Sequence, residues 1–477
     1  MASKLSREVD LGKEPIGSLL FTLAVPAITS QVVNVLYNMV DRMYIGHIEG
    51  IGATALTGVG VAFPIIMIIS AFAALMGMGG APRASILMGK KNNEGAEQIL
   101  GNCFSALFLT SIVLTIVVLV FQEPLLMLFG ASSNTIGYAK DYMSIYALGT
   151  IFVQMTLGLN NFISAQGFSK ISMLTVIIGA VTNIVLDPIF IFGFHMGVSG
   201  AALATIISQA VSAVWAIRFL SGKTTVLKLR KKNFRIQPSV LLPCIALGIA
   251  PFIMQATESI LTLCFNSSLL KYGGDLAVGA MTILSSVMQF AMLPLQGLTQ
   301  GGQPIISYNY GANNAERVKK AFKLMLTCCL IYSAALWALI ELFPGMFVAI
   351  FTNDPELTEL TTWALRIYMA GLVVFGAQIG CQQTFIAFGN SKISAFLAMF
   401  RKIIVLIPLI YILPIFMEDN VLAVFLAEPI ADIIAVLTTV TLFSIYFKKL
   451  LRSMRDQDKE KIITWMTDEQ YRGSSAG

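Results

Sequence analysis

Long apolar stretches separated by short polar ones dominate the chain. About twelve of them are long enough to cross a bilayer as helices, since the hydrocarbon core requires about 20 residues. They cover roughly 16–45, 54–79, 98–121, 141–164, 171–194 and 198–220 in the first half, and 240–268, 276–300, 320–343, 361–386, 393–416 and 421–447 in the second. The pattern predicts an all-α integral membrane protein with twelve transmembrane helices.

The most polar internal stretch, 221–238, is rich in Lys and Arg and separates the two halves. We therefore expect an N-lobe at 1–220, a basic cytoplasmic linker at 221–238, a C-lobe at 239–447 and a cytoplasmic C-terminal tail at 448–477. Each half holds an even number of spans, so both insert in the same orientation. Such halves are parallel repeats related by an axis along the membrane normal.

A duplication supports this division. The segment 80–94 recurs at 302–316, with its Gly, Pro, Ser, Gly, Asn and Glu residues in register, and 167–172 recurs at 389–394 with the same shift of 222 positions. Duplicated halves in so apolar a chain point to a transporter whose substrate path lies between two lobes. The repeated segments themselves read as a structural turn between helices on the cytoplasmic side.

The distribution of charge agrees with this topology. Only 12% of residues are charged, the mean hydropathy is +0.77 and the net charge is +6. If both termini are cytoplasmic, 26 of the 32 Lys and Arg residues fall on that side, as the positive-inside rule requires. The net positive charge therefore reports topology, and no nucleic-acid partner is expected. The polar first fifteen residues show no cleavage site, so a removed signal peptide is not expected.

Several kinds of chemistry are excluded. The six cysteines lie inside apolar runs without CxxC spacing, and the two histidines lie far from any of them, so neither a disulfide framework nor a zinc site is expected. No GxxxxGK[ST] loop is present to hydrolyse ATP. We expect no catalytic residues and no cofactor, and uphill transport must draw on an ion gradient or a partner.

Two acidic residues in the first half lie within predicted spans. Such groups are costly in a bilayer and usually functional. Asp41 follows Asn34 and Asn38 on one helix face, and Asp187 follows Asn183 by four residues on another. The plainer alternatives are that Asp41 anchors the helix at the headgroup level and that Asp187 shapes the break at the proline that follows it.

Depth along the helices brings these two faces together. Asp187 lies about 25 Å from the start of its span, and Thr205 lies about 10 Å from the outer end of the next. A polar cluster in the outer half of the first lobe follows. Two neighbouring carboxylates away from water disfavour each other's charged forms, so the pair can take up a proton outside and release it inside. Thr205 and Asn183 alone would more often hold helices together.

The second half does not copy this chemistry. Its intramembrane acids are Glu258, which aligns with Asn34 and lies near Gln255, and the weaker candidates Glu428 and Asp432. Glu258 reads equally as a contact for a cationic substrate or as a local bond to a neighbouring helix. Pro26 and Pro251 each remove a hydrogen bond inside a span, which predicts a hinge or a fixed bend.

These motifs together resemble the multidrug and toxic compound extrusion (MATE) family, and within it the bacterial MepA-type branch. The resemblance covers nearly the whole chain and rests on the first span, both repeated segments, 183–190, 200–205 and 401–408. It implies a V-shaped bundle in the bacterial plasma membrane that acts as a monomer among lipids. The implied activity is export of cationic amphipathic drugs in exchange for H⁺ or Na⁺ by alternating access. The implied first-lobe cation and proton site draws on Asn34, Asp41, Asn160, Asn183, Asp187 and Thr205. Within it we expect Asp41, Asn183, Asp187 and Thr205 to couple transport to H⁺, or to Na⁺ as the alternative ion. We expect the substrate to be bound by Asn34, Asn160, Gln255 and Glu258.

One departure bears on the coupling ion. Some family members carry an aspartate in the tenth helix, where this chain has Gln378, Gln382 and Gln383 and no acid. This favours protons over Na⁺. Two alternatives remain: a lipid-linked oligosaccharide flippase, which needs basic residues lining its path, and a membrane enzyme or receptor, which needs a catalytic or metal constellation.

Overall fold

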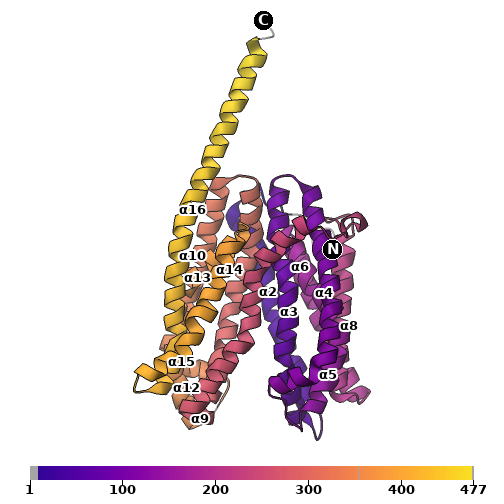
Figure 1. Cartoon of the computed structure of the whole chain (residues 1–477), viewed down its shortest axis with the longest axis vertical. Coiled ribbons are helices and arrows are strands. Elements are labelled where there is room, and N and C mark those ends of the chain that lie inside the picture. Colours follow the sequence, from indigo (N-terminus) through magenta and orange to yellow (C-terminus); the bar gives the residue numbers. More distant parts are fainter. Residues whose placement is uncertain (1–8, 353, 475–477) are drawn as a thin grey trace.

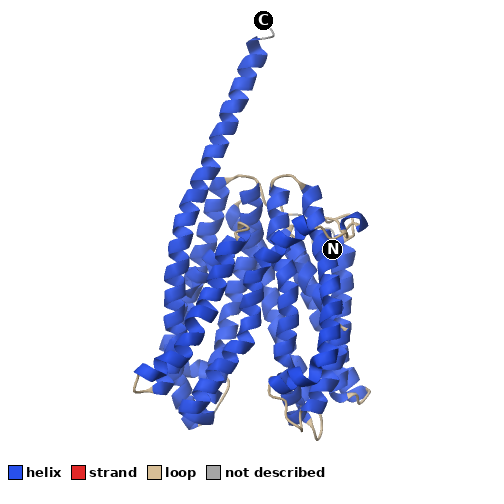
Figure 2. Cartoon of the chain, viewed as in Figure 1, coloured by secondary structure: helices blue, strands red, loops and turns tan. Residues whose placement is uncertain are grey.

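The computed structural model describes residues 9–352 and 354–474. Throughout these residues the chain is helical and contains no strand (Figures 1 and 2). Lys4 and Arg7, two of the 26 basic residues expected on the cytoplasmic side, lie outside the described residues.

The first lobe is built from seven α-helices and one π-helix. In chain order they are α2 (Ile16–Gly46), α3 (Gly52–Gly89), α4 (Asn93–Leu128), α5 (Ile136–Leu148), α6 (Thr150–Ala165), α7 (Ser169–Pro188), η1 (Ile189–Gly193) and α8 (Gly197–Leu220).

The linker holds one short 3-10 helix, and the second lobe follows. The elements are η2 (Lys231–Asn233), α9 (Pro238–Gly311), α10 (Ala315–Leu342), α11 (Pro344–Val348), α12 (Pro355–Tyr368), α13 (Leu372–Ala387), α14 (Ser391–Met399), the π-helix η3 (Phe400–Leu406), α15 (Ile407–Phe416) and α16 (Asn420–Ser474).

The membrane spans match the predicted pattern. Within the described chain, nine helices are long and apolar enough to cross a membrane, and the bent pairs α5–α6 and α12–α13 raise the number to 11. Helix α9 has 74 residues and is interrupted at Gly274, whose φ of 65° and ψ of −162° are not helical. A straight helix of that length would measure about 110 Å, several times the hydrocarbon thickness. Counting α9 as two spans gives the twelve that the sequence predicts.

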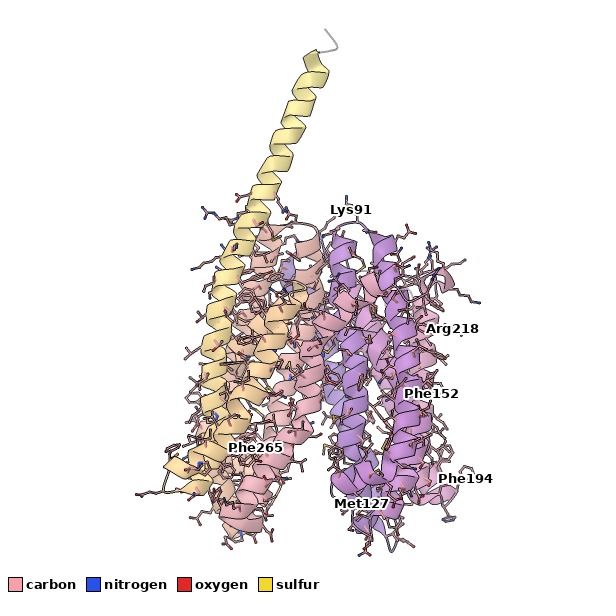
Figure 3. The ribbon with its side chains drawn as sticks, viewed as in Figure 1. Lys91, Met127, Phe152, Phe194, Arg218 and Phe265 are labelled. Carbon is pink, nitrogen blue, oxygen red and sulfur yellow. The ribbon has the colours of Figure 1, made fainter. Side chains whose placement is uncertain are left out.

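The bundle has two distinct ends. We call the end that carries Lys90, Lys91 and the linker the basic end, and the other the opposite end. Figure 3 labels Lys91 at the basic end and Met127 and Phe194 at the opposite end. The ribbons of the two lobes lie close together at the basic end and diverge toward the opposite end (Figure 1).

The repeated segments form equivalent turns at the basic end. Lys91 and Asn313, 222 positions apart, both adopt positive φ, 61° and 58°. The next residue caps a helix in each copy: Asn92 accepts a hydrogen bond from the amide of Gly95, and Asn314 accepts one from that of Arg317. The predicted turn is therefore present twice, with the same geometry.

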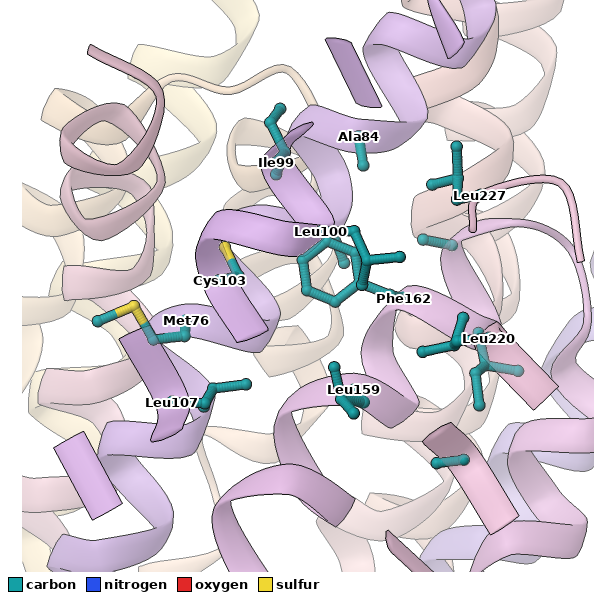
Figure 4. Packing of buried hydrophobic residues seen from close by; sticks show 14 of the residues in the cluster. Met76, Ala84, Ile99, Leu100, Cys103, Leu107, Leu159, Phe162, Leu220 and Leu227 are labelled. Atoms are coloured by element: carbon teal, nitrogen blue, oxygen red, sulfur yellow. The ribbon is translucent and has the colours of Figure 1, made fainter. Parts of the chain in front are cut away.

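Apolar side chains fill each lobe. In the first lobe Phe162 and Leu159 on α6 pack against Leu100, Cys103 and neighbouring residues of α3, α4 and α8 (Figure 4). Phe162, Leu159 and Leu100 have no solvent exposure. This packing gives the lobe a rigid frame on which polar side chains can be held.

The start of each lobe packs into the other lobe. Leu19 and Leu23 of α2 belong to the same apolar cluster as Leu295 and Ile305 of the second half. Cys244, early in α9, belongs to the core cluster of the first lobe. Pro26 lies inside α2 and Pro251 inside α9, just beyond these crossing segments, and a hinge or a fixed bend at either proline stays a prediction.

The linker is fastened to α4. Glu97 forms a 2.8 Å ion pair with Arg230 and accepts a hydrogen bond from the amide of Lys228. Asn102 accepts a 2.6 Å bond from the amide of Gln237. The linker thus belongs mechanically to the first lobe, even though it leads into the second.

Glycines bring the lobes into backbone contact near the basic end. A Cβ placed on Gly248 of α9 would stand 1.8 Å from the carbonyl oxygen of Leu75 on α3, and one on Gly301 would stand 2.5 Å from the Cα of Ala24 on α2. Only glycine permits helices to approach so closely. Gln31 extends the contact by donating a 3.0 Å hydrogen bond to Gln300 across the lobes.

The predicted C-terminal tail is helical where it is described. Helix α16 continues without interruption from Asn420 to Ser474. Its end projects beyond the bundle at the basic end (Figure 1). Asn313 ties the helix to the repeated turn by donating a 3.1 Å hydrogen bond to the carbonyl of Met454.

Candidate functional site

Two carboxyl groups meet inside the first lobe. Asp41 on α2 is 7% exposed, and Asp187 at the end of α7 is fully buried. Their side chains are close enough to hydrogen-bond one another. Such a bond needs a proton on one of the two, because two carboxylates have only acceptor oxygens. The pair is therefore arranged to share a proton.

Two polar side chains, Asn183 on the same helix and Thr205 on α8, orient Asp187. Asn183 donates a 3.1 Å hydrogen bond to Oδ1 of Asp187 and lies 3.4 Å from Oγ1 of Thr205 on α8. The four-residue spacing of Asn183 and Asp187 puts both on the face of α7 that meets α2 and α8. The predicted convergence of Asp41, Asn183, Asp187 and Thr205 is present in the structure.

Three residues that were not predicted from the sequence complete this cluster: Tyr37, Tyr142 and Gln209. The Tyr37 hydroxyl lies within hydrogen-bonding reach of Asn38 and Gln209 and close to Asp41. Tyr142 on α5 reaches Thr205. The spacing of Tyr37 and Asp41, four residues along α2, was the one signal available for either tyrosine.

Other predicted residues lie outside the cluster. The backbone oxygen of Asn34 accepts a 2.6 Å hydrogen bond from the Asn38 side chain. Asn160 donates to the carbonyl of Ser172, about 22 Å along α7 from Asp187. Asn160 therefore stands apart from the two carboxyl groups.

The first-lobe cluster has no internal cation. Among the described residues none forms a salt bridge with Asp41 or Asp187. The charge of Arg42 acts on Asp41 without forming an ion pair, and its guanidinium lies over the Phe63 ring at 4.9 Å. Asp41 Oδ1, Asp187 Oδ2 and Asn183 Oδ1 are buried and have no hydrogen-bond partner within the described structure. Buried acceptors of this kind require a proton or another cation.

The acids of the second lobe are paired instead. Glu258 on α9 is bonded to Lys402 of η3, whose ammonium also donates a 2.7 Å bond to the carbonyl of Met254. The local-bond interpretation of Glu258 thus describes its contacts here. No hydrogen bond involves the nearby Gln255 side chain within the described residues.

Arg401 joins the remaining two acids. Its guanidinium lies 2.8 Å from Oε1 of Glu428 and 2.7 Å from Oδ1 of Asp432, both on α16. The ring of Phe375 on α13 lies under the guanidinium at 4.5 Å. The two lobes therefore differ in kind: one holds acids without bases, and the other holds acids with bases.

Comparison with known proteins places the chain in a family. A family model described as MatE matches residues 26–189 and 251–412, one match in each lobe and together more than half of the chain. The multidrug export protein MepA of Staphylococcus haemolyticus (strain JCSC1435) is 26% identical over 390 residues, which cover 82% of this chain and 85% of that protein. The protein of the same name from Staphylococcus aureus (strain N315) is also 26% identical, over 402 residues, 84% of this chain and 88% of the relative.

Solved structures show the same fold. An outward-facing conformation of a multidrug resistance MATE family transporter of the MOP superfamily has a TM-score of 0.87 at 23% identity and covers 93% of this chain and 98% of that one. A crystal structure of MATE in the bent conformation has a TM-score of 0.86 at 23% identity, with 95% and 98% covered. The chain belongs to the MatE family of multidrug and toxic compound extrusion (MATE) transporters and is a membrane transporter, not an enzyme.

Proposed function

We propose that this transporter exports cationic amphipathic compounds in exchange for protons by alternating access. The observation that carries the proposal is the buried Asp41–Asp187 pair, which has no cation of its own. An unpaired carboxyl pair in an apolar lobe gains most from binding a proton or a cation. The relatives named multidrug export protein MepA support drugs as the substrate class.

The proton and the cationic drug compete for the negative charge of the Asp41–Asp187 pair, and the transport cycle follows from this competition. Protonation of the Asp41–Asp187 pair from outside removes the negative charge that holds a cationic drug in the first lobe, and the drug is released. Deprotonation inside restores the site. Each ligand must favour a different arrangement of the lobes for exchange to occur. The glycine contact at the basic end, which holds the lobes together there, is the element whose opening would expose the site to the other side.

The basic side chains at one end of the bundle indicate how the protein is oriented in the membrane. We propose that the basic end faces the cytoplasm of a bacterial cell, with both termini on that side, because Lys and Arg gather there. On this orientation, the arrangement seen here is closed toward the cytoplasm. The Asn183 amide and the Thr205 hydroxyl keep Asp187 in position during both steps.

A flippase for a pyrophosphate-linked lipid fits less well. That activity needs unpaired basic side chains along the path. The second-lobe spans offer Arg366, Arg401 and Lys402 for this role, and Arg401 and Lys402 are both bound to carboxylates. They leave little positive charge for a pyrophosphate group.

The proposal is tested by measuring ethidium efflux from cells that produce wild-type protein, Asp41→Asn or Asp187→Asn. Asparagine keeps the shape of the side chain but can neither ionise nor take up a proton. Both variants should lose efflux and its dependence on external pH. Unchanged efflux and pH dependence in both variants would rule the mechanism out.

A further inference from the structure

Five charged residues of the second lobe form one cluster, which we call the C-lobe charge cluster: Glu258, Arg401, Lys402, Glu428 and Asp432. Three carboxylates face two cations, so the cluster carries one surplus negative charge when all five are ionised. Apart from Glu258 these side chains are largely buried. An unbalanced charge in such surroundings is strongly disfavoured.

We propose that the cluster is a second exchange site, where a monovalent organic cation binds Glu258, moves Lys402 inward and expels one proton from Glu428 and Asp432. This inference rests on the proposed function, since it supplies that transport cycle with a second point at which cation and proton exclude each other. The site is separate from the first-lobe carboxyl pair and uses different helices.

The inner carboxylates of the cluster, those of Glu428 and Asp432, face one positive charge fewer than they need for neutrality. A single guanidinium, that of Arg401, serves both Glu428 and Asp432. Oδ2 of Asp432 is left buried and without a hydrogen-bond partner among the described residues, facing the break at Gly371 between α12 and α13. A proton on this inner pair balances the charge while Lys402 is bound to Glu258.

The outer pair of the cluster, Glu258 and Lys402, can exchange partners with an incoming cation. The Glu258 side chain is 61% exposed, whereas that of Lys402 is 5% exposed. An incoming cation can therefore reach Glu258 without entering the buried part of the cluster. The charge of Lys402 already acts on Glu428. If Lys402 turns toward the inner acids, two cations face two carboxylates there, and Glu258 is free to pair with the ligand. The cluster is neutral in both arrangements.

Few other charged or titratable groups face the inner carboxylates. Arg401, Lys402 and Glu258 act on Glu428 from η3 and α9, and Tyr368 of α12 is the remaining titratable neighbour. Tyr368 is a phenol, which is uncharged near neutral pH. The proton that leaves must therefore come from Glu428 or Asp432.

The charged residues of the cluster have no charged counterparts at the equivalent positions of the first copy of the repeat. The positions 222 residues earlier than Arg401, Lys402, Glu428 and Asp432 hold Gly179, Ala180, Ile206 and Ala210. None of these can carry charge. The pairing is therefore a property of the C-lobe and not of the repeated scaffold.

The test is ethidium binding to purified protein in which Asp41→Asn and Asp187→Asn silence the first lobe. Proton release is measured by calorimetry in two buffers of different ionisation enthalpy. We expect about one proton released per ethidium bound, since binding and protonation are linked. Adding Lys402→Gln should tighten binding about tenfold, a change of about 1.4 kcal/mol, and abolish proton release. Lys392→Gln, an exposed lysine on α14, is the control and should change neither.

Glu258→Gln tests the same claim through an accessible side chain, in case Lys402→Gln does not fold. It should remove ethidium-linked proton release from the silenced protein. The proposal is overturned if Lys402→Gln weakens binding or leaves it unchanged, or if the silenced protein binds ethidium without releasing a proton. Failure of the proposed function would appear separately, as normal efflux in Asp41→Asn and Asp187→Asn cells.

Discussion

Gly89 and Gly311 occupy equivalent positions in one contact between the two lobes. A Cβ on Gly89 would stand 2.0 Å from the carbonyl oxygen of Tyr308, and a Cβ on Gly311 would stand 2.0 Å from that of Ile86. Each glycine thus meets, in the other copy, the residue three positions before its counterpart. The duplicated segments join to one another across the lobe interface, and their glycines allow the backbones to touch.

Gly89→Ala should therefore prevent the basic end from closing as it does here. The added methyl meets backbone, which cannot move aside as a side chain can, and overpacking of this kind costs about 1–3 kcal/mol. Dye efflux should fall about tenfold or more. Gly60→Ala in the same helix is the control, because a Cβ there meets nothing within 4 Å. Equal efflux in the two variants would contradict the role of the contact.

Thr205→Ala should impair transport without unfolding the protein. It removes the hydroxyl beside Asn183 and loosens the side chain that orients Asp187. Losing one partner of a buried polar group costs about 1–3 kcal/mol, so efflux should fall about tenfold. Thr205→Ser keeps the hydroxyl and should retain most of the activity. The role assigned to Thr205 is wrong if serine and alanine behave alike.

Arg401→Ala should destabilise the second lobe severely. It leaves Glu428 and Asp432 buried without their shared cation, which typically costs about 3–5 kcal/mol. The melting temperature of the detergent-purified protein reports this change. Arg455→Ala, at an exposed position on α16, provides the comparison and should melt near the wild-type temperature. A wild-type melting temperature for Arg401→Ala would show that the cluster is not held together by this residue.

Glu97→Gln should release the linker from α4. The variant loses the charge that pairs with Arg230, at a buried carboxylate, and we expect a loss of about 1 kcal/mol together with faster proteolysis between 221 and 238. Glu94→Gln breaks the neighbouring pair with Lys232, in which both side chains are exposed, and should have little effect. Equal cleavage rates in the two variants would count against a fastened linker.

Features set by one helix, or by two adjacent ones, could be predicted from the sequence. Hydropathy placed the spans, and the spacing of Asn183 and Asp187 put both on one face. The relative depths of Asp187 and Thr205 then suggested the cluster that the structure contains. The signal was sufficient because α7 and α8 are consecutive and run antiparallel.

Apart from Asp41, which its depth and the family resemblance placed beside Asp187, contacts between distant helices could not be predicted in this way. Arg401 pairs with residues 27 and 31 positions away on a helix whose rotation the sequence does not specify. The contact of Gly89 with Tyr308 joins two copies of the repeat, whereas similarity between copies indicates only that each has the same local structure. A single span carries no information on which of its faces meets another lobe.

The central claim is that proton exchange at Asp41 and Asp187 drives export. Its most direct test is ethidium uptake into everted membrane vesicles, driven by a proton gradient alone and then by a sodium gradient alone. We predict uptake with the proton gradient in wild-type vesicles, none with sodium, and none in Asp41→Asn or Asp187→Asn vesicles. Uptake driven by sodium alone, or proton-driven uptake that survives both substitutions, would contradict the account.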